Sequence, residues 1–87
     1  MNISKEEQRV LHVLAQGGLI HYTRAANGKL VEADCFTHDG SRLVGCTLAV
    51  VARLRRKRLI ASESSRPYRI SEAGRRAVRS QPDNRTT

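Results

Sequence analysis

Aromatic residues are scarce in this chain of 87 residues, which contains Phe36, Tyr22 and Tyr68 and no tryptophan. A hydrophobic core must therefore be built from leucine, valine, isoleucine and alanine. In a chain of this length such a core is thin and only marginally stable. The length suits one domain and is too short for two, so we expect any function to lie on the surface of a single fold, without a deep active-site cleft.

Long apolar runs are also missing. No segment approaches the length needed to cross a bilayer, and the first residues lack the charged and then apolar layout of a signal peptide. We therefore expect a cytoplasmic protein without a membrane partner. Cys35 and Cys46 are expected to be reduced, buried thiols, because a single cysteine pair in a chain with no export signal is seldom a disulfide.

Groups for catalysis and for cofactor binding are missing as well. The acidic residues are scattered, and His12, His21 and His38 fall on different predicted elements, so no acid–base pair is assembled. Cys35, His38 and Cys46 are candidate zinc ligands, but a structural zinc site typically needs a fourth ligand, and Cys-x-x-Cys spacings are absent. We expect a non-enzymatic binding protein with no metal and no cofactor.

Charge, in contrast, is abundant and unevenly placed. Residues 1–43 hold five basic and five acidic side chains, whereas residues 44–87 hold eleven basic and three acidic ones, so the net charge of +8 lies in the second half. Thirteen of the sixteen cations are arginines, which bind phosphate and carboxylate groups in a bidentate manner. This asymmetry indicates an anionic partner, although a basic face can also serve solubility alone.

Local patterns predict a helix and a hairpin in the first half. Ser4 and Glu7 form a capping box before a helix over about residues 5–16, which ends at a pair of glycines. Residues 19–37 alternate apolar and polar around Asn27-Gly28, which predicts a β-hairpin. With those two as the turn, the paired residues are Ile20 and Cys35, Tyr22 and Ala33, and Arg24 and Val31 on an apolar face, and His21 and Asp34, and Thr23 and Glu32 on a polar face.

The second half predicts a basic helix and then a smaller hairpin. Apolar residues recur with helical spacing from Leu43 to Leu54, and this helix is expected to end near Arg58. Residues 59–62 and 67–70 are typical of two short strands joined by a polar turn. Ser71 is expected to cap a final short helix.

The order of these elements resembles the winged-helix arrangement, with a hairpin where ordinary winged-helix proteins have a helix. The predicted fold class is α+β: a small winged-helix-like domain over residues 1–80, with three helices, an N-terminal β-hairpin and a C-terminal two-stranded wing. Residues 81–87 are polar and are expected to form a disordered tail.

The predicted macromolecule-binding surface combines the end of the basic helix, the wing and the final helix. Its residues are Arg53, Arg55, Arg56, Lys57, Arg58, Arg66, Arg69, Arg75 and Arg76, with Arg79 as an extension. Residues 47–50, at the start of the basic helix, include no Arg, Asn or Gln that could read a base edge. A surface that follows phosphates without reading sequence fits these residues better. Part of the cluster can also be structural, since cations stabilise the C-terminal end of a helix.

Several segments together resemble the YjhX family and cover nearly the whole chain. They are the capping box at Ser4, Leu11–Ala15 with the glycine pair, Cys46–Val50, Leu59-Ile60, Pro67–Ile70 and Gln81–Arg85. The resemblance implies a toxin of a toxin–antitoxin pair that binds bacterial DNA topoisomerase I and inhibits it, with an antitoxin protein as a second partner. It transfers no individual site residue.

Two functions from different classes remain open. One is an inhibitor that binds topoisomerase I as a protein. The other is a winged-helix transcriptional regulator, whose binding to non-specific DNA would weaken steeply with salt. A surface that grips the DNA held by topoisomerase would combine the two.

Overall fold

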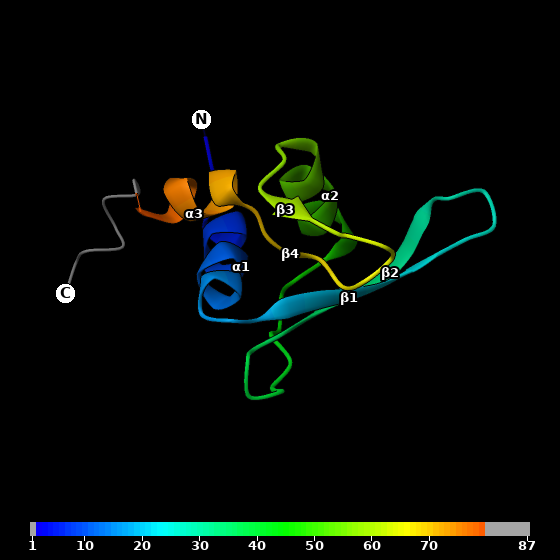
Figure 1. Cartoon of the computed structure of the whole chain (residues 1–87), viewed down its shortest axis with the longest axis horizontal. Coiled ribbons are helices and arrows are strands. Elements are labelled where there is room, and N and C mark those ends of the chain that lie inside the picture. Colours follow the sequence, from blue (N-terminus) through cyan, green and yellow to red (C-terminus); the bar gives the residue numbers. More distant parts are fainter. Residues whose placement is uncertain (1, 80–87) are drawn as a thin grey trace.

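The computed structural model describes residues 2–79. Within that range the chain is a small α+β domain with three helices and two small antiparallel hairpins. Its elements are α1 (Lys5–Ala15), β1 (Leu19–Arg24), β2 (Leu30–Phe36), α2 (Leu48–Arg56), β3 (Ile60–Ala61), β4 (Arg69–Ile70) and α3 (Glu72–Arg79). Figure 1 shows α1 between α3 and α2, with the β1–β2 hairpin projecting beyond α2. The α+β class is confirmed, and the tail predicted over residues 81–87 lies outside the described residues.

Helix α1 begins at the predicted capping box. The hydroxyl of Ser4 accepts a hydrogen bond from the Glu7 amide at 3.1 Å, and the Ser4 amide donates to the Glu7 carboxylate at 2.7 Å. The helix ends at Ala15, and Gly17 follows with φ of 101°, a conformation that favours glycine. The helix predicted over about residues 5–16 is confirmed.

The β1–β2 hairpin has the predicted register over most of its length. The antiparallel pairs are Ile20 with Cys35, His21 with Asp34, Tyr22 with Ala33, and Thr23 with Glu32. Ile20 and Cys35 are fully buried, and His21 and Glu32 are exposed. The alternation therefore places the apolar face of the hairpin on the core, as expected.

The tip of this hairpin differs from the prediction. Ala25 and Lys29 close a three-residue loop through a 2.8 Å backbone hydrogen bond, and Gly28 has φ of 86°. Arg24 consequently pairs with Leu30, and a bulge at Val31 restores the register further along. The predicted pairing of Arg24 with Val31 is wrong, because a three-residue loop ending in a left-handed glycine replaced the two-residue turn.

Helix α2 begins later than the apolar spacing predicts. Residues 42–46 run beside β2 instead, where the Leu43 amide donates to the Cys35 carbonyl at 2.8 Å. Gly45 then turns the chain with φ of 97°, and the Thr47 hydroxyl caps the helix by accepting from the Val50 amide at 3.2 Å. A helical start at Leu43 is therefore wrong, since backbone bonds to β2 and the turn at Gly45 prevail over apolar periodicity.

The end of α2 is closed by a Schellman motif. The Leu59 amide donates to the Leu54 carbonyl and the Arg58 amide to the Arg55 carbonyl, both at 3.0 Å. Arg58 takes the left-handed position with φ of 61°. Leu54 and Leu59 are both fully buried, which supplies the apolar contact that accompanies this motif. The helix ends at Arg56, close to the predicted position.

The β3–β4 hairpin is tied to β1 through Tyr68. Ile20 and Tyr68 exchange two backbone hydrogen bonds, at 3.0 and 2.9 Å. The hydroxyl groups of Tyr22 and Ser62 are 2.9 Å apart, and the Arg24 guanidinium donates to the Tyr68 hydroxyl at 2.8 Å. These contacts hold the two hairpins together, although they are far apart in the sequence.

Helix α3 packs close to the turn that follows α2. The Ser71 hydroxyl caps α3 by accepting from the Gly74 amide at 3.1 Å, and it donates to the Arg58 carbonyl at 2.8 Å. A β-carbon at Gly74 would overlap the Leu59 carbonyl oxygen. The predicted cap at Ser71 is confirmed, and glycine at position 74 allows this close approach.

Candidate macromolecule-binding surface

Two cations of the predicted basic cluster form ion pairs with a buried carboxylate. Lys57 donates to both oxygens of Glu7 at 3.0 Å and to the Asn2 carbonyl at 2.7 Å. The Arg53 guanidinium lies 3.6 Å from the same carboxylate, and the Glu7 side chain is only 1% exposed. Lys57 and Arg53 therefore neutralise an internal charge and join α1 to α2.

Burial and hydrogen bonding act in opposite directions on Glu7. Burial raises the pKa of its carboxyl, whereas the Ser4 amide and the hydrogen bond and charge of Lys57 lower it. The lowering effects prevail, so the pKa lies below its ordinary value and Glu7 is ionised at neutral pH. The sequence carried a signal for this burial, because Glu7 shares the helical stripe of Val10, Leu11 and Leu14.

The other cations at the end of α2 point to solvent. Arg55, Arg56 and Arg58 are exposed, and within residues 2–79 none of them forms an ion pair with a carboxylate. They lie within four consecutive positions, and their guanidinium groups form a positively charged patch on the surface.

The arginines of the β3–β4 hairpin line a hollow of their own. Arg66 and Arg69 border a depression of about 460 Å³ on the β3–β4 hairpin, together with Glu63. The Arg69 guanidinium also reaches the Gly17 carbonyl at 3.5 Å. Glu63 partly offsets the positive charge of these two arginines at the hollow.

The arginines of α3 form a separate group. Arg75, Arg76 and Arg79 are all exposed, and Arg76 is 3.7 Å from Glu72 in the same helix. Helix α1 packs against both α2 and α3, and Figure 1 shows α3 on the side of α1 away from the projecting hairpin. The structure therefore divides the predicted surface into three groups, on α2, on the β3–β4 hairpin and on α3.

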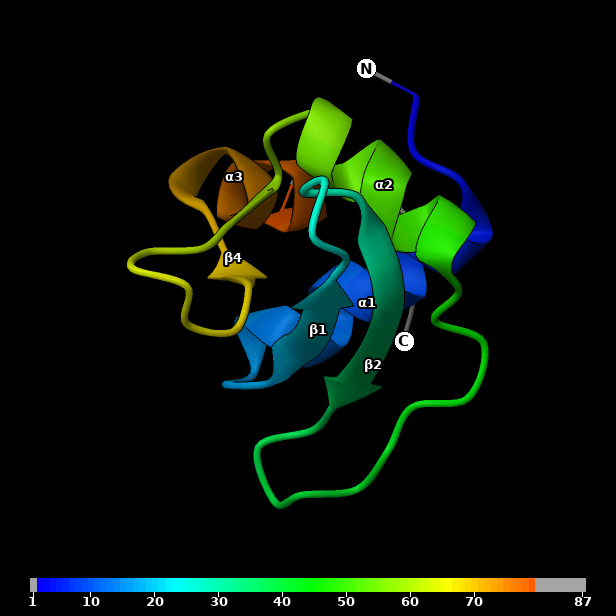
Figure 2. The same cartoon turned by 90° about the vertical axis from the view of Figure 1, so that its right-hand side faces the viewer.

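The α2 group adjoins a groove that the sequence did not predict. The groove has a volume of about 360 Å³ and lies between the tip of the β1–β2 hairpin and α2. Its lining residues are Gly28, Lys29, Leu30, Leu48, Ala49, Ala52 and Arg55. In Figure 2, which is turned by 90° from Figure 1, the hairpin tip lies in front of α2, and Figure 1 shows that the tip projects beyond this helix. The loop at Ala25–Lys29 gave no signal of this contact, because the two walls come from distant segments.

The cysteines are free thiols that contact each other. Cys35 is buried as predicted, whereas Cys46 is half-buried. The hydrogen bond between the two thiols, together with burial, raises the pKa of Cys35. The same hydrogen bond lowers the pKa of Cys46, because it stabilises the Cys46 thiolate.

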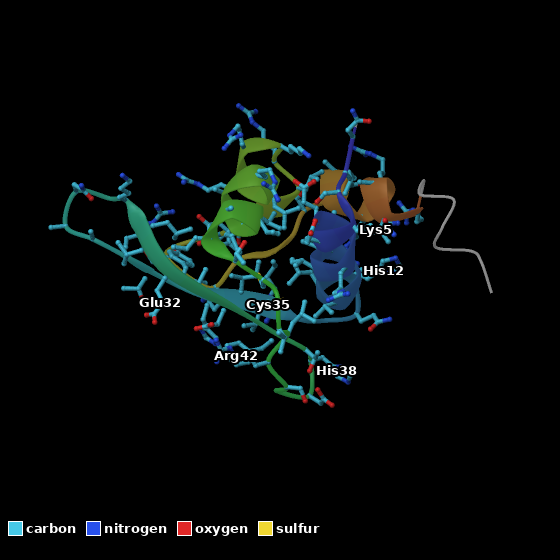
Figure 3. All side chains as sticks on the ribbon, turned by 180° about the vertical axis from the view of Figure 1, so that it is seen from behind. Lys5, His12, Glu32, Cys35, His38 and Arg42 are labelled. Atoms are coloured by element: carbon cyan, nitrogen blue, oxygen red, sulfur yellow. The ribbon has the colours of Figure 1, made fainter. Side chains whose placement is uncertain are left out.

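The histidines are not assembled into a site. Figure 3 shows His12 on α1 and His38 on the loop after β2, well separated from each other. The ring of His21 packs edge-on against the ring of Phe36, and the two ring centroids are 5.5 Å apart. Residues 2–79 contain no group of three or more histidine, cysteine or acidic side chains arranged to hold a metal ion. Over the same range, no helix has the length and apolar character to cross a membrane.

Comparison with known proteins identifies the family. A family model described as "Putative toxin of bacterial toxin-antitoxin pair" matches residues 1–85. A UPF0386 protein of Ruegeria sp. is 65% identical over 98% of this chain and 100% of its own length. UPF0386 proteins of Beijerinckia indica and Caulobacter vibrioides are 62% and 55% identical, over 98% of this chain and 100% and 93% of their lengths. No solved structure matches the chain. The predicted resemblance is confirmed: the chain belongs to the YjhX toxin family.

Proposed function

We propose that this protein is a toxin that binds bacterial DNA topoisomerase I and inhibits it without catalysis of its own. Family membership supports the toxin role and implies an antitoxin as a second partner. The observation that carries the binding mode is the exposed group of Arg55, Arg56 and Arg58, which have no carboxylate partner within residues 2–79. The proposed target also places the protein in the cytoplasm.

A winged-helix-like fold is part of the proposal. Helix α2 is followed by the β3–β4 hairpin, which we interpret as a wing, and the backbone bonds between Ile20 and Tyr68 join that hairpin to β1. Both features support the interpretation, while the β1–β2 hairpin replaces the usual intervening helix. The likeness of fold does not by itself imply DNA reading.

The start of α2 favours a protein target over a DNA operator. In helix-turn-helix proteins the N-terminal residues of the recognition helix contact base edges. Here Leu48 and Ala49 occupy these exposed positions and offer no hydrogen-bonding side chain. Non-specific contact with phosphates through the arginines remains compatible with these residues.

The test is relaxation of supercoiled plasmid by the topoisomerase I of the same organism, with this protein titrated in. We expect inhibition that persists when excess linear competitor DNA is added, because the enzyme itself is the target. Inhibition that disappears with competitor DNA, and with added salt, would mean that the protein coats DNA. Absence of inhibition under both conditions would overturn the proposal.

Substitutions of surface arginines test which part of the protein binds topoisomerase I. The double substitution Arg55→Gln and Arg56→Gln removes two charges from α2 without disturbing Glu7, and it should weaken inhibition. The matched control is Arg75→Gln with Arg76→Gln, which removes the same charge from α3. Arg53 is kept unchanged, because its loss would also disturb the buried carboxylate 3.6 Å away. Equal effects of the two double variants would show that net charge alone is responsible.

A further inference from the structure

The groove between the hairpin tip and α2 has an apolar floor. Leu48 is 40% exposed, Ala49 is exposed and Ala52 is half-buried, so one side of α2 presents small and aliphatic side chains to solvent. Leu30 of β2 forms the opposite wall. Because exposed aliphatic side chains gathered in a concave surface favour an apolar ligand group, this floor is suited to the apolar side of a partner.

The rim of the groove is positively charged. Lys29 lines it from the hairpin tip and Arg55 from α2, and a second hollow of about 380 Å³, lined by Ala52, Arg55 and Arg56, adjoins it. Among the residues that the structure describes, no carboxylate belongs to either lining. Glu32, on the same hairpin, points away from α2 in Figure 3. The rim therefore attracts a partner with negative charge.

The combination of floor and rim selects the class of partner. A nucleic acid backbone presents phosphates and sugars, and it would leave Leu48, Ala49 and Leu30 without apolar contact. An amphipathic protein helix with acidic residues on its polar side satisfies both requirements, since its apolar side fills the groove and its carboxylates reach the rim.

We infer that this groove is the docking site for an acidic amphipathic helical segment of a protein partner. The inference rests on the proposed function only in that the protein acts by binding another protein. The partner's leucine-type side chains lie against Leu48, Ala49 and Ala52. Its carboxylates pair with Lys29 and Arg55.

The probe is a fluorescent synthetic peptide of about 14 residues, or roughly four helical turns. It has leucines at helical spacing on one side and glutamates on the other. One comparator replaces the leucines with serine, and a second replaces the glutamates with lysine. We expect the full chain to bind the first peptide at least about tenfold more tightly than either comparator. In NMR spectra, the amide signals that change chemical shift on peptide binding should be centred on Leu30, Leu48 and Ala49.

Three single variants localise the binding. Ala49→Glu and Ala52→Glu place a carboxylate in the groove, and each should weaken peptide binding by at least about tenfold. Val44→Glu makes a similar charge change at a site that is 83% exposed and outside the groove, and should leave binding unchanged. Ala49 is exposed, so its variant is expected to fold even if the half-buried Ala52 tolerates glutamate poorly.

Several results would overturn the inference. These are absence of saturable binding, equal binding of the serine peptide, shifts centred elsewhere, or displacement of the peptide by a DNA duplex that shifts the same amides. The peptide assay contains no topoisomerase. Absence of inhibition in the relaxation assay would therefore not contradict the inference about the groove. Absence of peptide binding would likewise not contradict an observed inhibition of topoisomerase.

Discussion

The carboxylate of Glu7, near the start of α1, accepts hydrogen bonds at both oxygens from the ammonium of Lys57, at the C-cap of α2, at 3.0 Å. The same carboxylate accepts from the Ser4 amide at 2.7 Å. One side chain thus caps its own helix and fixes the position of another helix. The same contact neutralises the charge of Lys57, which otherwise would add to the basic surface of the second half of the chain.

Substituting Glu7→Gln should destabilise the protein strongly. Glutamine has nearly the same shape and preserves the capping box, but it leaves Lys57 and Arg53 without their counter-charge. We expect a loss of about 2–3 kcal/mol in the free energy of unfolding, below the roughly 3–5 kcal/mol of fully buried pairs, because both cations are partly exposed. Urea denaturation of the native protein and the variant measures this loss in unfolding free energy. Glu6→Gln, exposed in the same turn, is the control and should cost less than about 0.5 kcal/mol.

The contribution of Glu7 should depend on pH in a defined direction. Its pKa lies below the ordinary value of 4.5 because the Ser4 amide and Lys57 outweigh the opposing effect of burial. The unfolded chain therefore takes up a proton first as the pH falls, so the stabilisation is complete well above 4.5 and is lost as the pH falls through the folded-state pKa. The difference in unfolding free energy between the native protein and Glu7→Gln should be largest near about pH 7 and shrink towards about pH 3. A constant difference over this range would contradict the assignment.

Replacing Arg58 by glycine should stabilise the fold. Arg58 is held at φ of 61°, where a β-carbon costs roughly 1 kcal/mol and glycine has no penalty. Thermal unfolding should show a higher midpoint for Arg58→Gly. Arg55→Gly is the control within the helix and should lower the midpoint, because glycine costs about 1 kcal/mol at a regular helical position. Equal destabilisation by both substitutions would exclude a favourable left-handed glycine at position 58.

The two thiols should react at different rates. The Cys35 thiol donates a hydrogen bond to Cys46, which lowers the pKa of Cys46 and, with burial, raises that of Cys35. As the pH rises towards the ordinary value, Cys46 should form a thiolate first and be alkylated by iodoacetamide, while Cys35 reacts only on unfolding. Mass spectrometry of digested protein measures both sites. In Cys46→Ser the remaining thiol should react only on unfolding, and fast native alkylation of Cys35 would refute the assignment.

Much of the backbone could be predicted because its determinants are local. The capping box of Ser4 and Glu7, the alternation from Ile20 to Cys35 and the cap at Ser71 depend on side chains within one element or one hairpin. Hydrogen bonding and alternation over such short distances are visible in the sequence. The start of α2 was predicted too early. The Leu43 amide forms a backbone hydrogen bond to β2 instead of a helical one, and apolar spacing does not reveal such a bond.

The candidate surface was only partly predictable. The sequence by itself determined that the second half is basic and arginine-rich, and that the start of the basic helix lacks base-reading side chains. Only the tertiary structure decided which cations face outward, because Glu7 binds Lys57 and Arg53 across about fifty positions of sequence. It likewise brought Gly28 and Lys29 of the hairpin loop into one groove with residues of α2. Charge and periodicity are properties of the chain, whereas neutralisation of a buried carboxylate and the walls of a groove exist only when distant segments pack together.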